Sequence, residues 1–276
     1  MRLKPFGESG AKVSEIGMGT YYDPLWIAGA MVGWRRGAGS KLAALKAGLE
    51  GGINFIDSAE LYGSEPIVAD AIRGLKREDL FVATKVWTNH LGRDSLPKAL
   101  NRSLRRLGLS YVDLYQVHFP SRLKPISETM HAMEAAKESG KILNIGVSNF
   151  SLKQMIDANE ALSRSEIASN QVNYSLVHRD IEEDLLPYCE RNHVEIISYY
   201  PLGHGKLAKA VDRLQPICQR NSKTPAQVAL NWLSSKDVVF PIPRASRAGH
   251  VKENLGASDW RLTESERAEL DRAFPR

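Results

Sequence analysis

Residues 112–118 read VDLYQVH, a short apolar run that ends in a histidine. Two earlier runs of the same kind also end in ionisable residues: INFID (53–57) ends in Asp57, and LFVATK (80–85) ends in Lys85. Runs that barely alternate between apolar and polar residues are typical of strands buried on both faces of a parallel sheet. If the three runs are neighbours in one barrel, their carboxyl ends open on one mouth, where such barrels carry their chemistry.

The rest of the chain repeats this unit. An earlier apolar run covers Val13 to Met18, and later runs end near Val147, Gln171, Tyr199 and Pro243, which makes eight in all. Segments with helical periodicity lie between them, at 41–50, 67–75, 96–107 and 127–139. Eight such repeats in 276 residues predict one α/β domain over residues 1–276, closed as a (β/α)8 TIM barrel.

Helix start and stop signals agree with this reading. TPAQ (224–227) places a capping threonine, a first-turn proline and a third-position glutamine before an apolar run. TESE (263–266) repeats the capping box before a last, extra helix at the carboxyl terminus. The glycines at 51–52 and 140 stand where helices are expected to end.

Two segments stand outside the repeat. Near the amino terminus, residues 3–6 and 12–16 flank a turn at 7–10 and predict a β-hairpin that plugs the bottom of the barrel. After the first strand, residues 21–39 contain two tryptophans and four glycines and indicate a long loop at the mouth. That loop either contacts substrate or packs as a surface loop, and the sequence favours neither.

The charge pattern argues against a nucleic-acid partner. The net charge is +5 and the isoelectric point about 9.1, but the basic residues are interleaved with 32 acidic ones and form no long run. Binding to nucleic acid needs clustered as well as net positive charge. A locally positive groove for a phosphorylated small molecule fits this pattern better.

Several other classes are excluded by what the sequence lacks. The two cysteines, Cys189 and Cys218, form no C-x-x-C pair, and no secretory signal begins the chain, so we expect a cytoplasmic protein. No apolar stretch approaches the roughly 18 residues of a membrane span, and we expect no membrane partner. The seven histidines are scattered without a ligand spacing, so no metal is expected.

Four side chains at the strand ends suit delivery of a proton to a carbonyl oxygen. A free tyrosine has a pKa near 10 and is a weak donor, but a cationic lysine beside the phenol makes it a stronger acid. We therefore expect Tyr62 to give the proton, Lys85 to tune it, Asp57 to keep Lys85 charged, and His118 to bond the carbonyl oxygen.

Each of these residues alone has an ordinary structural explanation. Tyr62 is consistent with packing, Lys85 with a surface charge, Asp57 with a helix cap and His118 with a bond to a backbone carbonyl. Their joint appearance at successive strand ends is what favours an enzyme.

The chain resembles the aldo-keto reductase family. DSAELYG (57–63) resembles the family's D-x-A-x-x-Y-G segment, and TKVW (84–87) resembles its lysine strand. YVDLYQVHFP (111–120) resembles its histidine segment, and GVSNF (146–150) and IPRAS (242–246) match two further signatures. The five motifs occur in order and the resemblance covers essentially the whole chain.

That resemblance implies an enzyme that reduces aldehydes or ketones to alcohols with a nicotinamide cofactor. By it, Tyr62 is the general acid, Lys85 and Asp57 tune it, and His118 orients the carbonyl. The residues at 17–22 lack the third glycine of a Rossmann fingerprint, but the family binds its cofactor without one.

The resemblance also implies where the cofactor binds. Ser148, Asn149 and Gln171 would hold the carboxamide, Tyr199 would stack on the nicotinamide, and the turn 202–206 would hold the pyrophosphate, although that turn also reads as an ordinary β–α connection. The expected cofactor residues are Gly19, Thr20, Asp57, Ser148, Asn149, Gln171, Tyr199, Leu202, Gly203, Gly205, Lys206, Arg244, Ser246, His250, Glu253 and Asn254.

Arg244 bears on the choice between NADPH and NADH. It falls where the family often has a lysine near the 2′-phosphate, and a guanidinium suits that dianion. His250 replaces the arginine that is common at its position, which weakens the signal, and Arg247 reads equally as a solvated charge. We expect NADPH, with NADH as the alternative.

The sequence indicates only the chemical class of the substrate. Trp26, Trp87, Phe119 and His118 are the expected substrate contacts, and Trp34 is a further candidate for the apolar wall. An open pocket for a small carbonyl or sugar-like compound is expected. The oligomeric state is not legible, and a monomer is the simplest expectation.

Two other functions remain open. Lys85 is a candidate Schiff-base nucleophile, as in barrel aldolases, although a paired Asp57 would keep the amine protonated and unreactive. A cofactor sensor without catalysis is the second, although all four reactive residues are intact.

Overall fold

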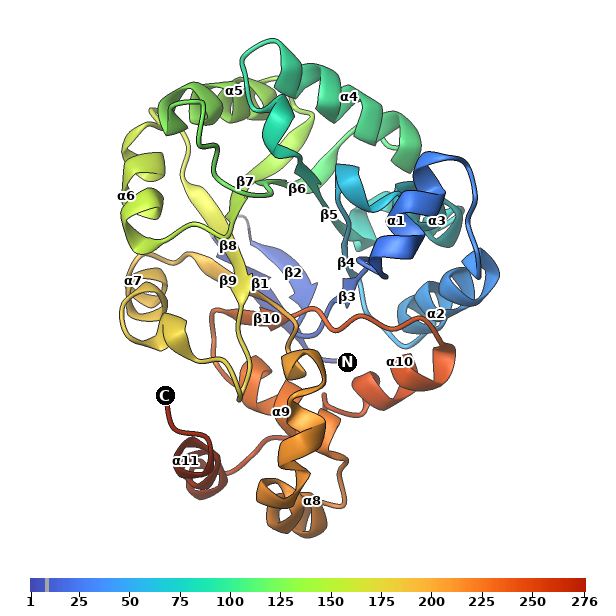
Figure 1. Cartoon of the computed structure of the whole chain (residues 1–276), viewed down its shortest axis with the longest axis vertical. Helices are drawn as coiled ribbons and strands as arrows, with labels where there is room; N and C mark the ends of the chain where they lie inside the picture. Colours follow the sequence, from blue (N-terminus) through green and yellow to red (C-terminus); the bar gives the residue numbers. More distant parts are fainter. Residues whose placement is uncertain (8–9) are drawn as a thin grey trace.

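The computed structural model describes residues 1–7 and 10–276, and eight parallel strands form its central sheet (Figure 1). The strands are β3 (Met18–Gly19), β4 (Phe55–Asp57), β5 (Phe81–Val86), β6 (Val112–Val117), β7 (Ile142–Ser148), β8 (Ile167–Asn173), β9 (Glu195–Tyr199) and β10 (Val239–Pro241). They pair in sequence order, and an isolated parallel bridge between Gly19 and Arg244 joins the first strand to the segment that follows the last one. The predicted (β/α)8 barrel is therefore confirmed.

Helices surround the strands. They are α1 (Pro24–Met31), α2 (Ala38–Glu50), α3 (Glu65–Ile72), α4 (Ser95–Leu107), α5 (Ile126–Glu138), α6 (Leu152–Glu160), α7 (Leu185–Arg191), α8 (Gln215–Asn221), α9 (Pro225–Ser234), α10 (Ala248–Leu255) and the extra α11 (Glu264–Ala273). Both predicted capping boxes are present, on Thr224 before α9 and Thr263 before α11. Among the described residues, no helix combines the length and apolar character needed to cross a bilayer.

The inside of the barrel is arranged in layers. Alternate residues of a strand point to the same side, so Phe81, Ala83 and Lys85 of β5 follow one another along the interior. The register pairs Asp57 of β4 with Ala83, and Lys85 with Gln116 of β6. Phe55, Phe81, Ala83 and Leu114 make the interior apolar below the mouth, and Glu195 at the start of β9 is a buried exception that accepts a bond from the Gly7 amide.

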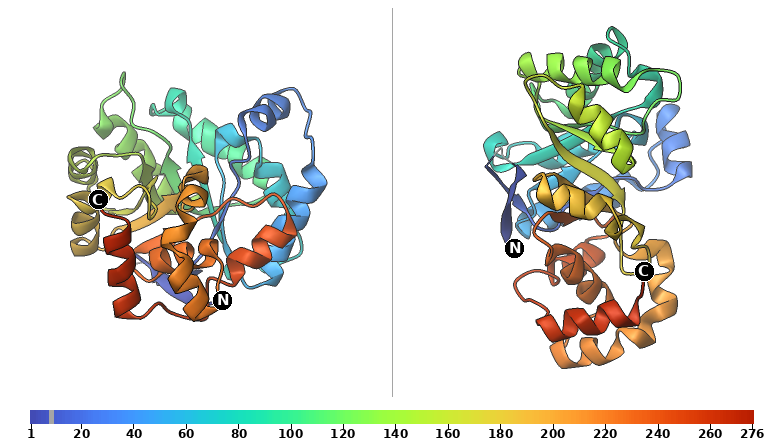
Figure 2. Two further views of the ribbon diagram at one scale, coloured as in Figure 1. Left: turned by 60° about the horizontal axis from the view of Figure 1, so that its bottom comes forward. Right: turned by 90° about the vertical axis from the view of Figure 1, so that its left-hand side faces the viewer.

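The predicted hairpin closes the opposite end. Its strands are β1 (Leu3–Phe6) and β2 (Ala11–Ser14), which pair antiparallel, and part of its predicted turn, residues 8–9, lies outside the described residues. Figure 1 shows the hairpin across the ring of strands, and Figure 2 shows it at the end of the molecule opposite α1. Phe6 is fully buried, with its ring centroid 4.6 Å from Phe81 and 5.3 Å from Phe240.

Two boundaries predicted from the sequence were wrong, that of the first barrel strand and that of the loop at 21–39. The run expected as the first barrel strand, Val13 to Met18, is divided: Ser14 pairs with Leu3 in the hairpin, and only Met18 begins β3. Between them Glu15 is fully buried and forms an ion pair with Arg261, so the chain turns there instead of continuing as a strand.

The predicted loop at 21–39 also contains a helix. α1 begins at Pro24, and the carboxylate of Asp23 accepts a hydrogen bond from the amide of Trp26, 2.8 Å away. An aspartate cap followed by a first-turn proline is a helix start signal. The glycines of the segment obscured it.

The hairpin contact can be tested by unfolding. We expect Phe6→Ala to lower the free energy of unfolding by about 3–5 kcal/mol, because a buried aromatic side chain is removed from a packed interior. Leu3→Ala on the same hairpin is the control, since Leu3 is 49% exposed, and it should change stability by about 0.5 kcal/mol or less. Equal losses in urea titrations would mean that the hairpin does not seal the barrel.

Candidate active site

A buried ion pair lies at the mouth of the barrel. Asp57 ends β4 and Lys85 lies near the end of β5, and Lys85 Nζ is 2.6 Å from Asp57 Oδ2. Lys85 Nζ also donates to the carbonyl oxygen of Ser58, at 2.8 Å. Lys85 is fully buried and Asp57 is 2% exposed. Burial lowers the pKa of Lys85, and the neighbouring Asp57 carboxylate opposes that shift.

Two glutamines complete the hydrogen bonds of Asp57. Its Oδ1 accepts from Gln171 Nε2 at 2.8 Å and from Gln116 Nε2 at 3.2 Å. Gln171 was expected to hold the cofactor, whereas Gln116 was not singled out from the sequence. An amide at an inward position of an otherwise apolar strand was the signal for Gln116, because a buried polar group requires a partner.

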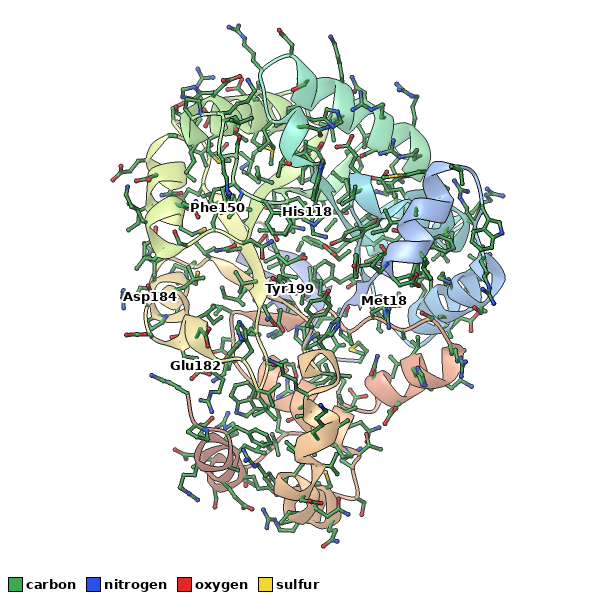
Figure 3. The ribbon with its side chains drawn as sticks, viewed as in Figure 1. Met18, His118, Phe150, Glu182, Asp184 and Tyr199 are labelled. Atoms are coloured by element: carbon green, nitrogen blue, oxygen red, sulfur yellow. The ribbon has the colours of Figure 1, made fainter. Side chains whose placement is uncertain are left out.

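Tyr62 and His118 meet across the mouth. Tyr62 ends a short 3₁₀ helix, Glu60–Tyr62, and its hydroxyl lies 3.2 Å from His118 Nε2. His118 follows β6, and its backbone amide donates to the carbonyl of Val86 on β5. Figure 3 shows His118 and Tyr199 near the centre of the ring of strands. The structure thus brings together all four side chains expected at the strand ends.

The arrangement of Lys85 and Tyr62 differs from expectation in one respect. Lys85 Nζ lies over the phenol ring, 4.8 Å from its centroid, and its hydrogen bonds go to Asp57 and Ser58. Burial raises the pKa of Tyr62 well above its ordinary value, and the Asp57 carboxylate adds to the rise. In this arrangement Tyr62 is therefore fully protonated rather than primed as a strong acid.

His118 is held in its neutral form. Burial, and then the charge of Lys85, lower its pKa from 6.5 to about 2. Its Nδ1 is buried without a hydrogen-bond partner. The Phe119 ring stacks on the imidazole and the Trp87 ring meets its edge, each with centroids 5.2 Å apart. These two rings shield the imidazole from water, which explains why burial lowers its pKa.

Tyr62 lines a cleft with a volume of about 650 Å³. Of the residues expected to bind cofactor, the cleft is lined by Gly19, Asp57, Gln171, Tyr199, Leu202, Gly205 and Arg244. It is also lined by Tyr21, Tyr22, Asp23 and Pro24 of the predicted mouth loop, by His204 of the expected pyrophosphate turn, and by Tyr200, Pro201, Ile242 and Pro243, which were not among the expected site residues. Tyr200 and His204 both have left-handed backbone angles (φ 50° and 51°), which are uncommon outside glycine and concentrate at functional sites.

A second hydrogen-bond network joins two of the expected carboxamide ligands, Asn149 and Ser148, to Tyr199, which was expected to stack on the nicotinamide. Tyr199 Oη donates to Asn149 Oδ1 at 2.8 Å, and Asn149 Nδ2 donates to the carbonyl of His118 at 3.1 Å and contacts Ser148 Oγ at 3.0 Å. Asn149 has φ 62°, so its backbone also lies in the left-handed region. The network ties β7 and β9 to the segment that carries His118.

The segment around α1 covers Tyr62. Trp26 is 4% exposed, and its indole Nε1 donates to the carbonyl of Tyr62 at 2.9 Å. α1 also packs onto Gly63, which has φ 66° and where a Cβ would stand 2.4 Å from the Cβ of Ala30. Trp26 was expected to contact substrate, but here it supports the turn that carries Tyr62.

Arg244 reaches the same segment from the other side of the cleft. Its Nη1 donates to the carbonyl of Tyr22, and the guanidinium lies on the lining of the cleft. Trp34, the other tryptophan of this segment, is 59% exposed.

The remaining expected residues lie off the cleft lining. Thr20 is buried, and its hydroxyl contacts Ser64 Oγ at 2.8 Å. Asn254 is 7% exposed and faces, together with Gly19, a small separate cavity. Lys206 and His250 are exposed, Ser246 and Glu253 are half-buried, and Gly203 is buried. No cluster of His, Cys, Asp or Glu residues suited to a metal ion occurs in the described part of the chain.

Comparison with known proteins settles the family. The sequence profile described as "Aldo/keto reductase family" matches residues 27–274. The chain belongs to the aldo-keto reductase family. As a member it is an oxidoreductase of the NAD(P)H-dependent carbonyl-reductase type.

Its relatives include proteins of known activity and structure. Methylglyoxal reductase YeaE of Escherichia coli is 36% identical over 94% of this chain and 90% of its own length, and methylglyoxal reductase DkgB of Salmonella typhi is 34% identical over 80% and 83%. Among solved structures, the thermostable aldo-keto reductase Tm1743 in complex with epalrestat has a TM-score of 0.90 at 35% identity, covering 99% of this chain and 100% of that one.

A second solved relative was crystallised with cofactor. The aldo/keto reductase from Klebsiella pneumoniae in complex with NADP and acetate has a TM-score of 0.86 at 36% identity, covering 99% of this chain and 95% of that one.

The low pKa of His118 predicts how the stability of this reductase depends on pH. Between its folded pKa of about 2 and its ordinary value of 6.5, the unfolded protein binds the extra proton, so stability falls as the pH is lowered. From pH 7 to pH 5 this group should cost about 2 kcal/mol. In urea titrations we therefore expect wild type to lose about 2 kcal/mol more than His118→Gln over this pH range.

His131→Gln is the matched control, since His131 lies exposed on α5. It should follow the wild-type pH dependence. If His118→Gln also follows the wild type, His118 is not held neutral in the folded protein.

Proposed function

We propose that this aldo-keto reductase catalyses the NADPH-dependent reduction of aldehydes and ketones to alcohols, with Tyr62 as the proton donor. The observation that carries the proposal is the Tyr62 hydroxyl, which lies on the cleft and 3.2 Å from a neutral His118. A protonated phenol and a neutral imidazole are both able to donate a hydrogen bond to the same carbonyl oxygen. NADPH, when bound, supplies the hydride to the carbonyl carbon.

The chain's own residues supply the proton. Hydride addition leaves negative charge on the substrate oxygen, and Tyr62 transfers its hydroxyl proton to that oxygen, which completes the alcohol. The phenolate left on Tyr62 lies under the Lys85 ammonium, which favours that charged form. Asp57, Gln116 and Gln171 hold Lys85 in place and charged, and a proton from solvent restores the phenol.

We assign NADPH to the cleft because of particular side chains on and beside its lining. Arg244 places a guanidinium there, suited to the 2′-phosphate, and Tyr199 presents an aromatic face. Asn149, Ser148 and Gln171 would hold the carboxamide, and the turn at Leu202–Lys206 the pyrophosphate. The Klebsiella relative crystallised with NADP supports this choice over NADH.

For the substrate we propose small aldehydes, including 2-oxoaldehydes. The relatives named methylglyoxal reductases support this class. Trp87 and Phe119, which flank His118, are the proposed apolar walls. Methylglyoxal should therefore be among the compounds that consume NADPH in the presence of this protein.

Lys85 is poorly suited to the Schiff-base chemistry considered above. Its Nζ is fully buried and bonded to a carboxylate at 2.6 Å and a carbonyl at 2.8 Å, whereas a nucleophilic amine must be neutral and accessible. Borohydride trapping with a carbonyl ligand should leave Lys85 unmodified. A cofactor sensor would bind NADPH without consuming it. Measuring NADPH binding and NADPH consumption together separates a sensor from a reductase.

Replacing the proton donor should abolish turnover but spare binding. We expect Tyr62→Phe to keep its NADPH affinity and to lose about 100- to 10,000-fold in kcat, the size of general acid catalysis. Tyr21→Phe is the matched control, because its ring lies 5.2 Å from Tyr62 and lines the same cleft. Its kcat should remain within several-fold of wild type, and retained activity in Tyr62→Phe would reject the assignment.

Replacing Arg244 should change cofactor preference. We expect Arg244→Ala to weaken NADPH binding about tenfold or more, as expected for loss of a charge-assisted bond, while NADH binding changes little. Arg247→Ala, an exposed arginine three residues away, should leave both affinities unchanged. Equal weakening for NADPH and NADH in Arg244→Ala would mean that the residue acts by holding Tyr22 rather than a phosphate.

A further inference from the structure

Glu60 lies two residues before Tyr62, and its side chain is 10% exposed. It takes no part in the chemistry proposed above. The carboxylate is nevertheless surrounded by donors from two other parts of the chain, so its position in the fold calls for an explanation.

Three groups bond to the Glu60 carboxylate. The backbone amide of Trp87 donates to Oε2 at 3.1 Å. His90 Nδ1 lies 2.9 Å from Oε1, and Arg102 Nη2 donates to Oε1 at 3.1 Å. Burial acts to raise the pKa of Glu60, but the bonds from Trp87, His90 and Arg102 outweigh it and hold the pKa below its ordinary value. The group is therefore a carboxylate, able to accept all three bonds.

These bonds join the connection after β4, which carries Tyr62, to the end of β5, which carries Lys85. Glu60 belongs to the 3₁₀ helix that ends at Tyr62, after β4. Trp87 follows β5 two residues after Lys85, and its ring meets the edge of His118 with centroids 5.2 Å apart. Arg102 anchors the same carboxylate to the middle of α4.

We propose that Glu60 is a positioning residue, which sets the distance between the Tyr62 hydroxyl and His118 by tying the turn of Tyr62 to the segment of Trp87. The inference rests on the proposed function, because it assumes that Tyr62 and His118 act on one oxygen atom. Glu60 itself contacts neither reacting group.

The physical basis is the small tolerance of proton transfer. The Tyr62 hydroxyl and His118 Nε2 are 3.2 Å apart, and they come from different strand–helix connections. A shift of about 1 Å in such a pair can cost on the order of 100-fold in rate. Without the carboxylate, the amide of Trp87 loses its partner, and the remaining links between the two segments lie deeper, where Ser58 bonds to Ala83 and to Lys85.

The experiment compares kcat, NADPH affinity and stability in matched variants. We expect Glu60→Ala to lower kcat about 10- to 100-fold with NADPH affinity within about twofold of wild type. The kcat of Glu60→Gln should lie between those of wild type and Glu60→Ala, because the amide oxygen of the glutamine still accepts a bond from the Trp87 amide. The solvent deuterium isotope effect on kcat should rise in Glu60→Ala, since proton transfer from Tyr62 becomes slower.

Asp113→Ala is the matched control. Asp113 of β6 is 8% exposed, accepts a bond from the amide of Val82 at 2.7 Å and pairs with Arg77 at 2.6 Å, so it makes the same kind of cross-strand link near the other end of the barrel. It should lower the melting temperature at least as much as Glu60→Ala and keep its kcat and isotope effect.

The outcomes separate this inference from the proposed function. If wild type is active and Tyr62→Phe is not, but Glu60→Ala keeps the wild-type kcat and isotope effect, the positioning role is overturned. The same holds if Asp113→Ala loses as much kcat as Glu60→Ala. If wild type reduces no carbonyl, or Tyr62→Phe stays active, the proposed function itself fails.

Discussion

The buried pair of Asp57 and Lys85 constrains the whole mouth of this barrel. Two charges removed from water are costly unless every remaining donor and acceptor is satisfied. Here Ser58, Gln116 and Gln171 complete the pair, and they come from the ends of strands β4, β6 and β8. Four strand ends are thereby fixed relative to one another, which gives the cleft a rigid floor beside Tyr62.

The electrostatic consequence is a site with both hydrogen-bond donors uncharged. Asp57 neutralises Lys85, so the lysine charge reaches Tyr62 only across the face of its ring. Tyr62 is fully protonated and His118 is neutral, and both states follow from burial. The proposed proton transfer from Tyr62 therefore depends on the negative charge that develops on the substrate oxygen during the reaction.

The sequence predicted the parts of this site that follow from strand periodicity. Asp57, Lys85 and His118 end buried runs, and parallel strands bring such ends together, so their meeting could be inferred without coordinates. The helix at Pro24–Met31 was missed because four glycines outweighed one aspartate cap. The position of Lys85 over the phenol ring and the bonds of Glu60 depend on side-chain directions, which linear spacing does not encode.

The packing of α1 against Gly63 has a consequence for engineering. Because a Cβ at position 63 would collide with Ala30, α1 and the turn that carries Tyr62 fit together as one unit. Transplanting the segment of residues 21–39 into another barrel of this type would therefore fail unless its glycine partner travelled with it. Loop exchange in this enzyme is therefore limited to connections that leave the contact between α1 and Gly63 intact.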